Sequence, residues 1–254
     1  MYPSIQIGHV LFPTVSVSLW LALIALLVGT ALRAKQYGIG RGVLAGMFLA
    51  GATGFAASGL LFPESLQRHA SYTGLLAGVM AAAAALGACA VSRRVRFLRL
   101  ADCLAPPLAL CIVIVRVGSF MAGCDFGKPT GNGWGVTFTS GLALSWYGTP
   151  LGTPLHPTQL YEGALAAAIL VLLMILQRRS PADGILFSVF VALYALGRFF
   201  IEFLRGDADR GFLGPLSVAQ WLCLIALAAV VASRVHRLQA NKHCGAHSEV
   251  PSHR

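Results

Sequence analysis

Two arginines, Arg116 and Arg198, interrupt long apolar stretches of the sequence. A charged side chain in such a stretch is unfavourable in a membrane and is usually kept for a functional reason. Arginine carries a planar fork of N–H donors, which binds a phosphate group through two parallel hydrogen bonds. The two residues therefore predict an anion site, and the anion native to a membrane is the headgroup of a phospholipid.

Arg198 belongs to a group of three charged residues with helical spacing. Arg198, Glu202 and Arg205 share one face of a predicted helix, so Glu202 can pair with either arginine. A purely structural interpretation is also open, in which Arg198 and Glu202 form a buried ion pair between helices and Arg116 extends toward the membrane surface. We favour the functional interpretation, because two arginines in apolar segments are seldom kept for packing alone.

A second set of polar residues begins another apolar stretch, in the heptapeptide HPTQLYE at 156–162. His156, Gln159 and Glu162 recur every three residues, which predicts that they share one helical face. The proline of the heptapeptide suits the first position of a helix. Tyr72 opens a further apolar stretch on the same side of the membrane. Polar side chains from four predicted helices are thus expected at one depth.

These side chains must be positioned by helices in a membrane. Of the 254 residues, 57% are hydrophobic and 11% are charged, which is less than half the roughly 25% charged share of soluble domains. A helix of about 20 apolar residues spans the hydrocarbon layer. We therefore predict an all-α polytopic membrane protein of about seven transmembrane helices, at 15–31, 43–62, 72–91, 101–121, 157–176, 184–204 and 216–233.

The Lys and Arg residues set the orientation. They gather after the first, third, fifth and seventh predicted spans, and cytoplasmic loops carry the excess of such residues. The N-terminus is therefore expected outside and the C-terminus in the cytoplasm, with Arg116 and Arg198 in the outer half of the bilayer. The formal net charge of +10 then follows from topology and anionic inner-leaflet lipid, so nucleic acid is not expected as a partner.

The chain reads as one transmembrane domain, 1–235, followed by a tail at 236–254 that is expected to be disordered. Its one long polar connection is an outer loop at 123–155, which is rich in Gly and Pro and contains two tryptophans. Both a lid over the membrane and an ordinary loop with interfacial aromatic residues fit this composition. The six cysteines include no C-x-x-C pair, and the His and Cys residues of the tail are not expected to hold a metal.

Three motifs carry a resemblance to a known family. They are Arg116-Val-Gly-Ser-Phe with the following Gly123 and Gly127, the heptapeptide from His156 to Glu162, and Gly197-Arg198-Phe-Phe-Ile-Glu202-Phe-Leu-Arg205. In type and order they resemble the bacterial phosphatidylglycerol–prolipoprotein diacylglyceryl transferases, and the heptapeptide is the most specific part. The pairs Asp102 with Pro106 and Ser217 with Gln220 also stand where that family has similar residues.

The resemblance implies a transferase of the bacterial cytoplasmic (inner) membrane, with its active site toward the outer leaflet and no cofactor. Such an enzyme moves the diacylglyceryl group of phosphatidylglycerol to the lipobox cysteine thiol of a prolipoprotein signal peptide and releases glycerol phosphate. The implied catalytic residues are Arg116, Arg198, His156, Tyr72 and Glu202, and the implied substrate-binding residues are Ser119, Gly127, Gln159, Tyr161, Glu162 and Arg205. No metal ligand is implied. Arginines suit the departing phosphate, and His156 suits removal of the thiol proton or the orientation of a neighbour.

The sequence departs from the family pattern where protons would be handled. Tyr72 stands in place of a histidine, Ser119 in place of an asparagine, and Cys124 in place of a glutamate with Asp125 beside it. A divergent paralogue is therefore expected. The alternative is an inactive or altered-acceptor relative that binds phospholipid or a lipoprotein precursor without this transfer. A small-solute transporter is disfavoured, because the polar groups are expected at one depth instead of along a path through the bilayer.

Overall fold

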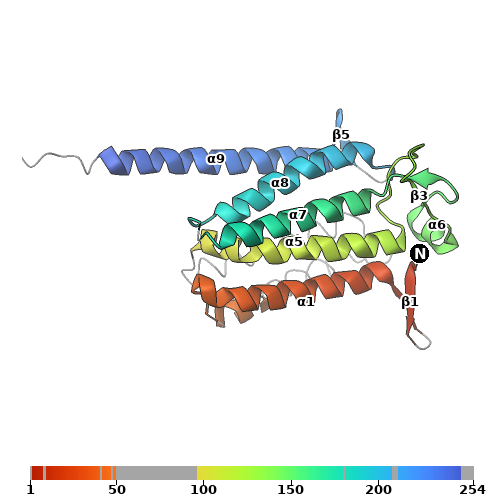
Figure 1. Cartoon of the computed structure of the whole chain (residues 1–254), viewed down its shortest axis with the longest axis horizontal. Coiled ribbons are helices and arrows are strands. Elements are labelled where there is room, and N and C mark those ends of the chain that lie inside the picture. The colour runs from red at the N-terminus through yellow and green to blue at the C-terminus, as the bar shows by residue number, and fades with distance from the viewer. Residues whose placement is uncertain are drawn as a thin grey trace, which may run out of the picture.

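The computed structural model describes residues 2–7, 10–40, 42–46, 48–49, 96–179, 181–207 and 211–246. Five long helices dominate this part of the chain and lie roughly side by side (Figure 1). Each is long and apolar enough to cross a membrane. The helices are α1 (Thr14–Ala34) continued by η1 (Lys35–Tyr37), α5 (Phe97–Ala122), α7 (Thr158–Gln177), α8 (Ile185–Ile201) continued by η2 (Glu202–Leu204), and α9 (Val218–Ala246).

These helices correspond to five of the predicted spans, with ends that differ by a few residues. The predicted span at 72–91, and with it Tyr72, lies outside the described residues, as does most of the span at 43–62. Helix α9 continues to Ala246, past residue 236, where the sequence analysis places the start of the tail. The length of the apolar stretch does not predict where α9 ends, because a helix that leaves a membrane can continue with polar residues.

Among the described residues, three short two-stranded antiparallel sheets and one short helix stand at the end of the bundle where α5 and α8 finish (Figure 1). The sheets pair β1 (Ser4–Ile7) with β2 (Val10–Pro13), β3 (Val136–Thr137) with β4 (Pro154–Leu155), and β5 (Phe212–Leu213) with β6 (Leu216–Ser217). The short helix α6 (Gly141–Tyr147) lies between β3 and β4. The connection at 123–155 is thus folded around its own apolar cluster, which consists of Phe126, Phe138 and Leu155.

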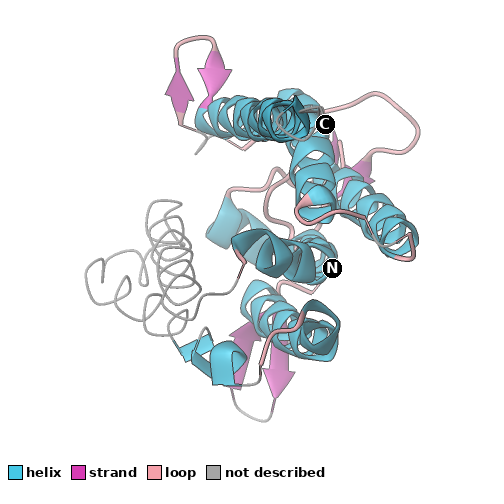
Figure 2. Ribbon diagram, turned by 90° about the vertical axis from the view of Figure 1, so that its left-hand side faces the viewer, coloured by secondary structure: helices cyan, strands magenta, loops and turns pink. Residues whose placement is uncertain are grey.

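Packing between neighbouring helices fixes where the site residues lie. α1 packs on α5, α5 on α7 and α8, and α8 on α9, and the end-on view in Figure 2 shows the same succession. A side chain at Gly118 of α5 would collide with Ser18 of α1, so this glycine allows the two helices to approach closely. The central apolar core is shared by α5, α7 and α8, through Ala105, Ala109, Ile169, Leu173, Leu186 and Phe190.

Candidate functional site

Glu162, in the first turns of α7, joins the two arginines that the sequence singled out. Arg116 of α5 places its Nη2 2.9 Å from Glu162 Oε1, and Arg198 of α8 places its Nε 3.5 Å from Glu162 Oε2. Tyr194, one turn before Arg198, donates its hydroxyl to the same carboxylate. The Glu162 side chain is only 2% exposed. One buried carboxylate therefore holds together residues from three helices.

Glu202 and Arg205 extend this network beyond the end of α8. Arg198 Nη1 pairs with Glu202, as its spacing of four residues predicted. Arg205 Nε lies 4.0 Å from the same carboxylate oxygen, Glu202 Oε2. The prediction that Glu202 can serve either arginine is confirmed, since it contacts both.

Two further carboxylates belong to the network. Asp125, in the turn after α5, lies 2.9 Å from Arg116 Nη1 and 2.7 Å from Arg205 Nη2. Asp207 lies 2.6 Å from Arg205 Nη2. We call the whole set the arginine cluster; its members are Arg116, Arg198, Arg205, Asp125, Glu162, Glu202 and Asp207.

The position of Arg116 differs from one part of the structural interpretation, although the ion pair of Arg198 and Glu202 that this interpretation expects is present. The structural alternative required its side chain to extend toward the membrane surface, but the guanidinium is turned into the bundle and bound by Glu162 and Asp125. Its side chain is 17% exposed and that of Arg198 is 12% exposed. The cluster thus brings guanidinium groups from α5, α8 and the segment after η2 to one place, where an anion can meet more than one of them.

His156 does not share a helical face with Gln159 and Glu162, and this prediction is wrong. Helix α7 begins at Thr158, and the proline at position 157 favours extended backbone in the residue before it. The backbone of His156 instead pairs with the turn after α5: Gly127 N donates to His156 O at 3.0 Å, and His156 N donates to Lys128 O at 3.0 Å.

Gly127 lies between two other segments of the chain. It forms an isolated antiparallel bridge with Arg205 and accepts no side chain, since a Cβ atom there would collide with the carbonyl oxygen of His156. On the same segment, Lys128 N donates to Leu204 O at 2.8 Å. Because position 127 is a glycine, the backbone after α5 can pass between the residues just before α7 and the end of η2. This path places Arg205 close to Arg116.

The remaining predicted residues lie around this turn. The ring of His156 contacts Tyr161, with 3.2 Å between Nδ1 and the hydroxyl oxygen. Gln159 Nε2 donates to Cys124 O at 2.6 Å, and Ser119 O accepts a hydrogen bond from Gly123 N at 2.9 Å. Gln159 and Ser119 are almost completely buried. Through these bonds, Gln159 and Ser119 support the turn after α5.

Cys124 is a small, partly buried residue in the turn after α5. Its Sγ lies 3.7 Å from Ser119 O and 4.0 Å from Asp125 Oδ2. Burial, together with the negative charge of Asp125, raises the pKa of the Cys124 thiol to about 12. Because the thiolate is the reactive form, this thiol is not an activated nucleophile at neutral pH.

We expect Cys124 in the folded protein to resist alkylation by N-ethylmaleimide at pH 8. With a pKa of about 12, about one thiol in 10,000 is ionised at that pH, and the reactive fraction rises tenfold with each pH unit. Mass spectrometry of the peptide that contains Cys124 measures the label. The same protein unfolded in detergent is the control, since an exposed thiol with a pKa near 8.5 labels readily. Labelling of the folded protein at pH 8 that is as fast as labelling of the unfolded control would contradict this result.

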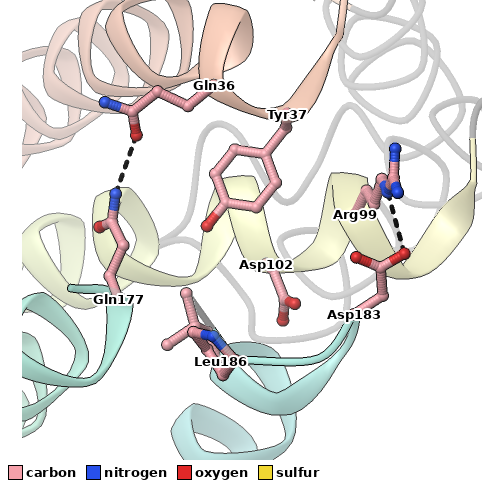
Figure 3. A pocket seen from close by; sticks show the side chains of 8 residues that line it. Gln36, Tyr37, Arg99, Asp102, Gln177, Asp183 and Leu186 are labelled. Carbon is pink, nitrogen blue, oxygen red and sulfur yellow. Dashed lines mark hydrogen bonds and ion pairs between the residues drawn. The ribbon is translucent and has the colours of Figure 1, made fainter. Parts of the chain in front are cut away.

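A separate polar region lies at the opposite end of the bundle. It surrounds a cavity of about 470 Å³ between η1, α5 and the start of α8 (Figure 3). Arg99 and Asp183 pair there at 2.9 Å. Asp102 accepts hydrogen bonds from Gly184 N and Phe187 N, so its carboxylate caps the start of α8.

Ser217 and Gln220, the second pair of residues that resembles the family outside the three motifs, also cap a helix. Ser217 N donates to Gln220 Oε1 at 2.9 Å, and Gln220 N donates to Ser217 Oγ at 3.2 Å. These reciprocal bonds satisfy backbone donors at the start of α9. Asp102, Ser217 and Gln220 therefore act on helix ends and lie outside the arginine cluster.

Three residues of the site were missing from the predicted set: Asp125, Asp207 and Tyr194. The acidic residues carry a signal that could have found the first two, because the chain has only nine of them and four belong to the arginine cluster. Tyr194 lies four residues before Arg198, which places it on the same helical face. A tyrosine inside an apolar helix has many ordinary roles, so its spacing alone did not single it out.

Comparisons with known proteins match the part of the chain that contains the arginine cluster. A family model described as prolipoprotein diacylglyceryl transferase matches residues 69–235. The chain is 30% identical over 168 residues to phosphatidylglycerol–prolipoprotein diacylglyceryl transferase 2 of Clostridium perfringens, which covers 66% of this chain and 63% of that protein. It is 37% identical over 155 residues to the phosphatidylglycerol–prolipoprotein diacylglyceryl transferase of Geobacter sulfurreducens, over 60% and 55% of the two chains. The matches span between half and two thirds of the curated relatives, and the family match contains the whole arginine cluster.

Proposed function

This chain belongs to the prolipoprotein diacylglyceryl transferase family, and we propose that it transfers the diacylglyceryl group of phosphatidylglycerol to the lipobox cysteine thiol of a prolipoprotein. The other product is glycerol phosphate. The observation that carries the proposal is the meeting of Arg116 and Arg198 on the buried carboxylate of Glu162. Curated relatives that carry phosphatidylglycerol and prolipoprotein in their names support the choice of both substrates.

The reaction requires removal of a proton from the acceptor thiol and stabilisation of negative charge on the departing phosphate. The acceptor thiol loses its proton, and the thiolate sulfur forms a bond to the glyceryl carbon while the bond from that carbon to the phosphate oxygen breaks. The electron pair of that bond leaves on the phosphate, which becomes more negative as the bond breaks. Arg116 and Arg198 are assigned to stabilise this charge, because fixed guanidinium donors act most strongly where charge develops.

Arginines that are already paired with carboxylates can still bind a phosphate. Each guanidinium has five N–H donors, so the contacts to Glu162, Glu202 and Asp125 leave donors for a ligand. The carboxylates hold each guanidinium in one orientation before the lipid arrives. Glu162 and Glu202 are therefore assigned to position the arginines, and Arg205 to extend the anion site.

Removal of the thiol proton is assigned to His156 or Tyr72. Histidine is the side chain most often used as a general base, and the ring of His156 lies beside the hydroxyl of Tyr161. Tyr72 occupies the place of the histidine in the family pattern and lies outside the described residues. A tyrosine ionises near pH 10, so Tyr72 would need a neighbouring positive charge to act at neutral pH.

The proposed arrangement in the membrane has seven spans, with the N-terminus outside and the C-terminus in the cytoplasm. The arginine cluster then opens toward the outer leaflet of a bacterial inner membrane, where a secreted precursor presents its signal peptide. The distribution of Lys and Arg along the sequence supports this orientation. The five apolar helices of the described residues support a membrane location.

Expression in bacteria depleted of their own transferase tests the proposal. We expect prolipoprotein in these cells to gain the mass of one diacylglyceryl group when this chain is expressed, as measured by mass spectrometry of the intact precursor. A double variant, Arg116→Ala with Arg198→Ala, serves as the inactive control. Correctly inserted wild-type protein that produces no mass shift would refute this activity.

The departures at Tyr72 and Ser119 favour one alternative, a relative that binds phospholipid or precursor without transfer. Under that alternative, purified protein retains phosphatidylglycerol and loses it in the Arg116→Ala and Arg198→Ala variants, while no product forms. Turnover in the same preparation eliminates the alternative. A product on an acceptor other than the prolipoprotein would instead identify an altered acceptor.

A further inference from the structure

The turn after α5 delivers Asp125 to the arginine cluster in an unusual backbone conformation. Helix α5 ends with Gly123 at φ 86°, and Asp125 follows at φ 57°, the one non-glycine residue of positive φ among those described. Aspartate and asparagine tolerate this left-handed conformation better than other side chains, although it remains less favourable than for glycine. The residue is therefore held there by its surroundings.

Side chains in the first turn of α7 hold the backbone of Asp125 in this conformation. Thr158 Oγ1 donates to Asp125 O at 2.7 Å, and Gln159 Nε2 donates to the preceding carbonyl oxygen, Cys124 O, at 2.6 Å. Both donor side chains are buried. The peptide groups on either side of the Asp125 backbone are thus fixed by the heptapeptide, and this determines where the carboxylate points.

The two carboxylate oxygens are divided between two arginines. Oδ2 lies 2.9 Å from Arg116 Nη1, and Oδ1 lies 2.7 Å from Arg205 Nη2. Glu162 contacts the other terminal nitrogen of Arg116, at 2.9 Å. The Arg116 guanidinium is therefore held on both of its terminal nitrogens, by Glu162 from α7 and by Asp125 from the turn.

We propose that Asp125 is a positioning residue for the transfer reaction, which sets the orientation of Arg116 and couples it to Arg205. The inference rests on the proposed function. Asp125 is not assigned as the base, because both of its oxygens are engaged by guanidinium groups, which favour the unprotonated carboxylate. Its contribution is the orientation of charge at the moment the phosphate leaves.

The negative charge of Asp125 matters as well as its shape. An asparagine at this position has one acceptor oxygen and one amide NH₂ group, so one of the two arginines would face a donor. That guanidinium would then turn away. Glutamate keeps the charge with one additional methylene group, so it can still reach a guanidinium with altered geometry.

The test measures kcat and KM for phosphatidylglycerol with a lipobox peptide, using the purified full chain in lipid nanodiscs. We expect Asp125→Asn to lower kcat about 10- to 100-fold, with a KM within about threefold of wild type because Arg116 and Arg205 keep their charge. Asp125→Glu is expected to recover part of the lost kcat. Asp183→Asn is the control, because it removes a carboxylate from Arg99 at the other end of the bundle, and a kcat within about threefold of wild type is expected there.

Each other result overturns the inference. An unchanged kcat in Asp125→Asn shows that the carboxylate does not position the arginines for reaction, and an unchanged kcat with a lower KM shows that it competes with the phosphate. An Asp125→Asn protein that fails to fold, while Asp125→Glu folds, shows a structural role alone. Absence of product with the wild-type chain overturns the proposed function and this inference with it, whereas a fully active Asp125→Asn variant leaves the proposed function intact.

Discussion

Replacing Arg198 with lysine is expected to lower diacylglyceryl transfer as strongly as replacing it with alanine, by about 100-fold or more. Arg198 uses Nε toward Glu162 and Nη1 toward Glu202, so two separate nitrogens of one rigid group contact two carboxylates. A lysine ammonium is a single point of charge and cannot keep both contacts while also binding a phosphate. Both variants are compared with wild type in the same transfer assay, after equal insertion has been verified.

The matched control for this experiment is Arg99→Lys. Arg99 lies at the other end of the bundle, where it pairs with Asp183, so the same substitution there tests the general effect of exchanging arginine for lysine. We expect its activity to stay close to that of wild type. Full activity in Arg198→Lys would show that positive charge alone suffices at this position. Contacts from two separate nitrogens would then not be required.

The Glu162→Gln variant is expected to lose both transfer activity and stability. Glu162 is buried between Arg116 and Arg198, and the glutamine keeps the shape of the side chain but removes the charge. Loss of one partner from a buried ion pair lowers the free energy of unfolding by about 3 kcal/mol, and two arginines depend on this partner. We therefore expect a lower unfolding temperature in detergent and at least about a 100-fold loss of turnover.

Asp183→Asn provides the comparison for Glu162→Gln. Its side chain is 39% exposed and pairs with arginines that are more exposed still, and exposed ion pairs contribute about 0–1 kcal/mol. A small change in stability and normal transfer are expected. If Glu162→Gln were as stable and active as Asp183→Asn, the buried carboxylate would not be the centre of the site.

Much of the helical framework could be predicted because it depends on a single property, the length of apolar sequence. The ends of α5 and α7 lie within a few residues of the predicted spans. The pairing of Arg198 with Glu202 was also predictable, since both residues lie on one helix and regular geometry sets their separation. Local periodicity was sufficient for these features.

The contacts of Asp125 and His156 could not be predicted in the same way. Asp125 reaches Arg205, which is 80 residues away in sequence, only because the turn after α5 adopts a left-handed conformation and runs beside the segment after η2. His156 leaves the helical face because its backbone pairs with that turn. Both depend on the path of irregular backbone, for which hydropathy and spacing carry little information.

The capping of α8 by Asp102 has a consequence for how the protein is made. The carboxylate belongs to α5, but the backbone donors that it receives, Gly184 N and Phe187 N, come from a segment that follows α7. A ribosome delivers α5 to the membrane well before these donors exist. For that interval the carboxylate has neither of these two donors, so this cap forms only after Gly184 and Phe187 have been synthesised. A chain that stops before residue 184 would lack this cap, and the buried carboxylate of Asp102 would then have to find other donors.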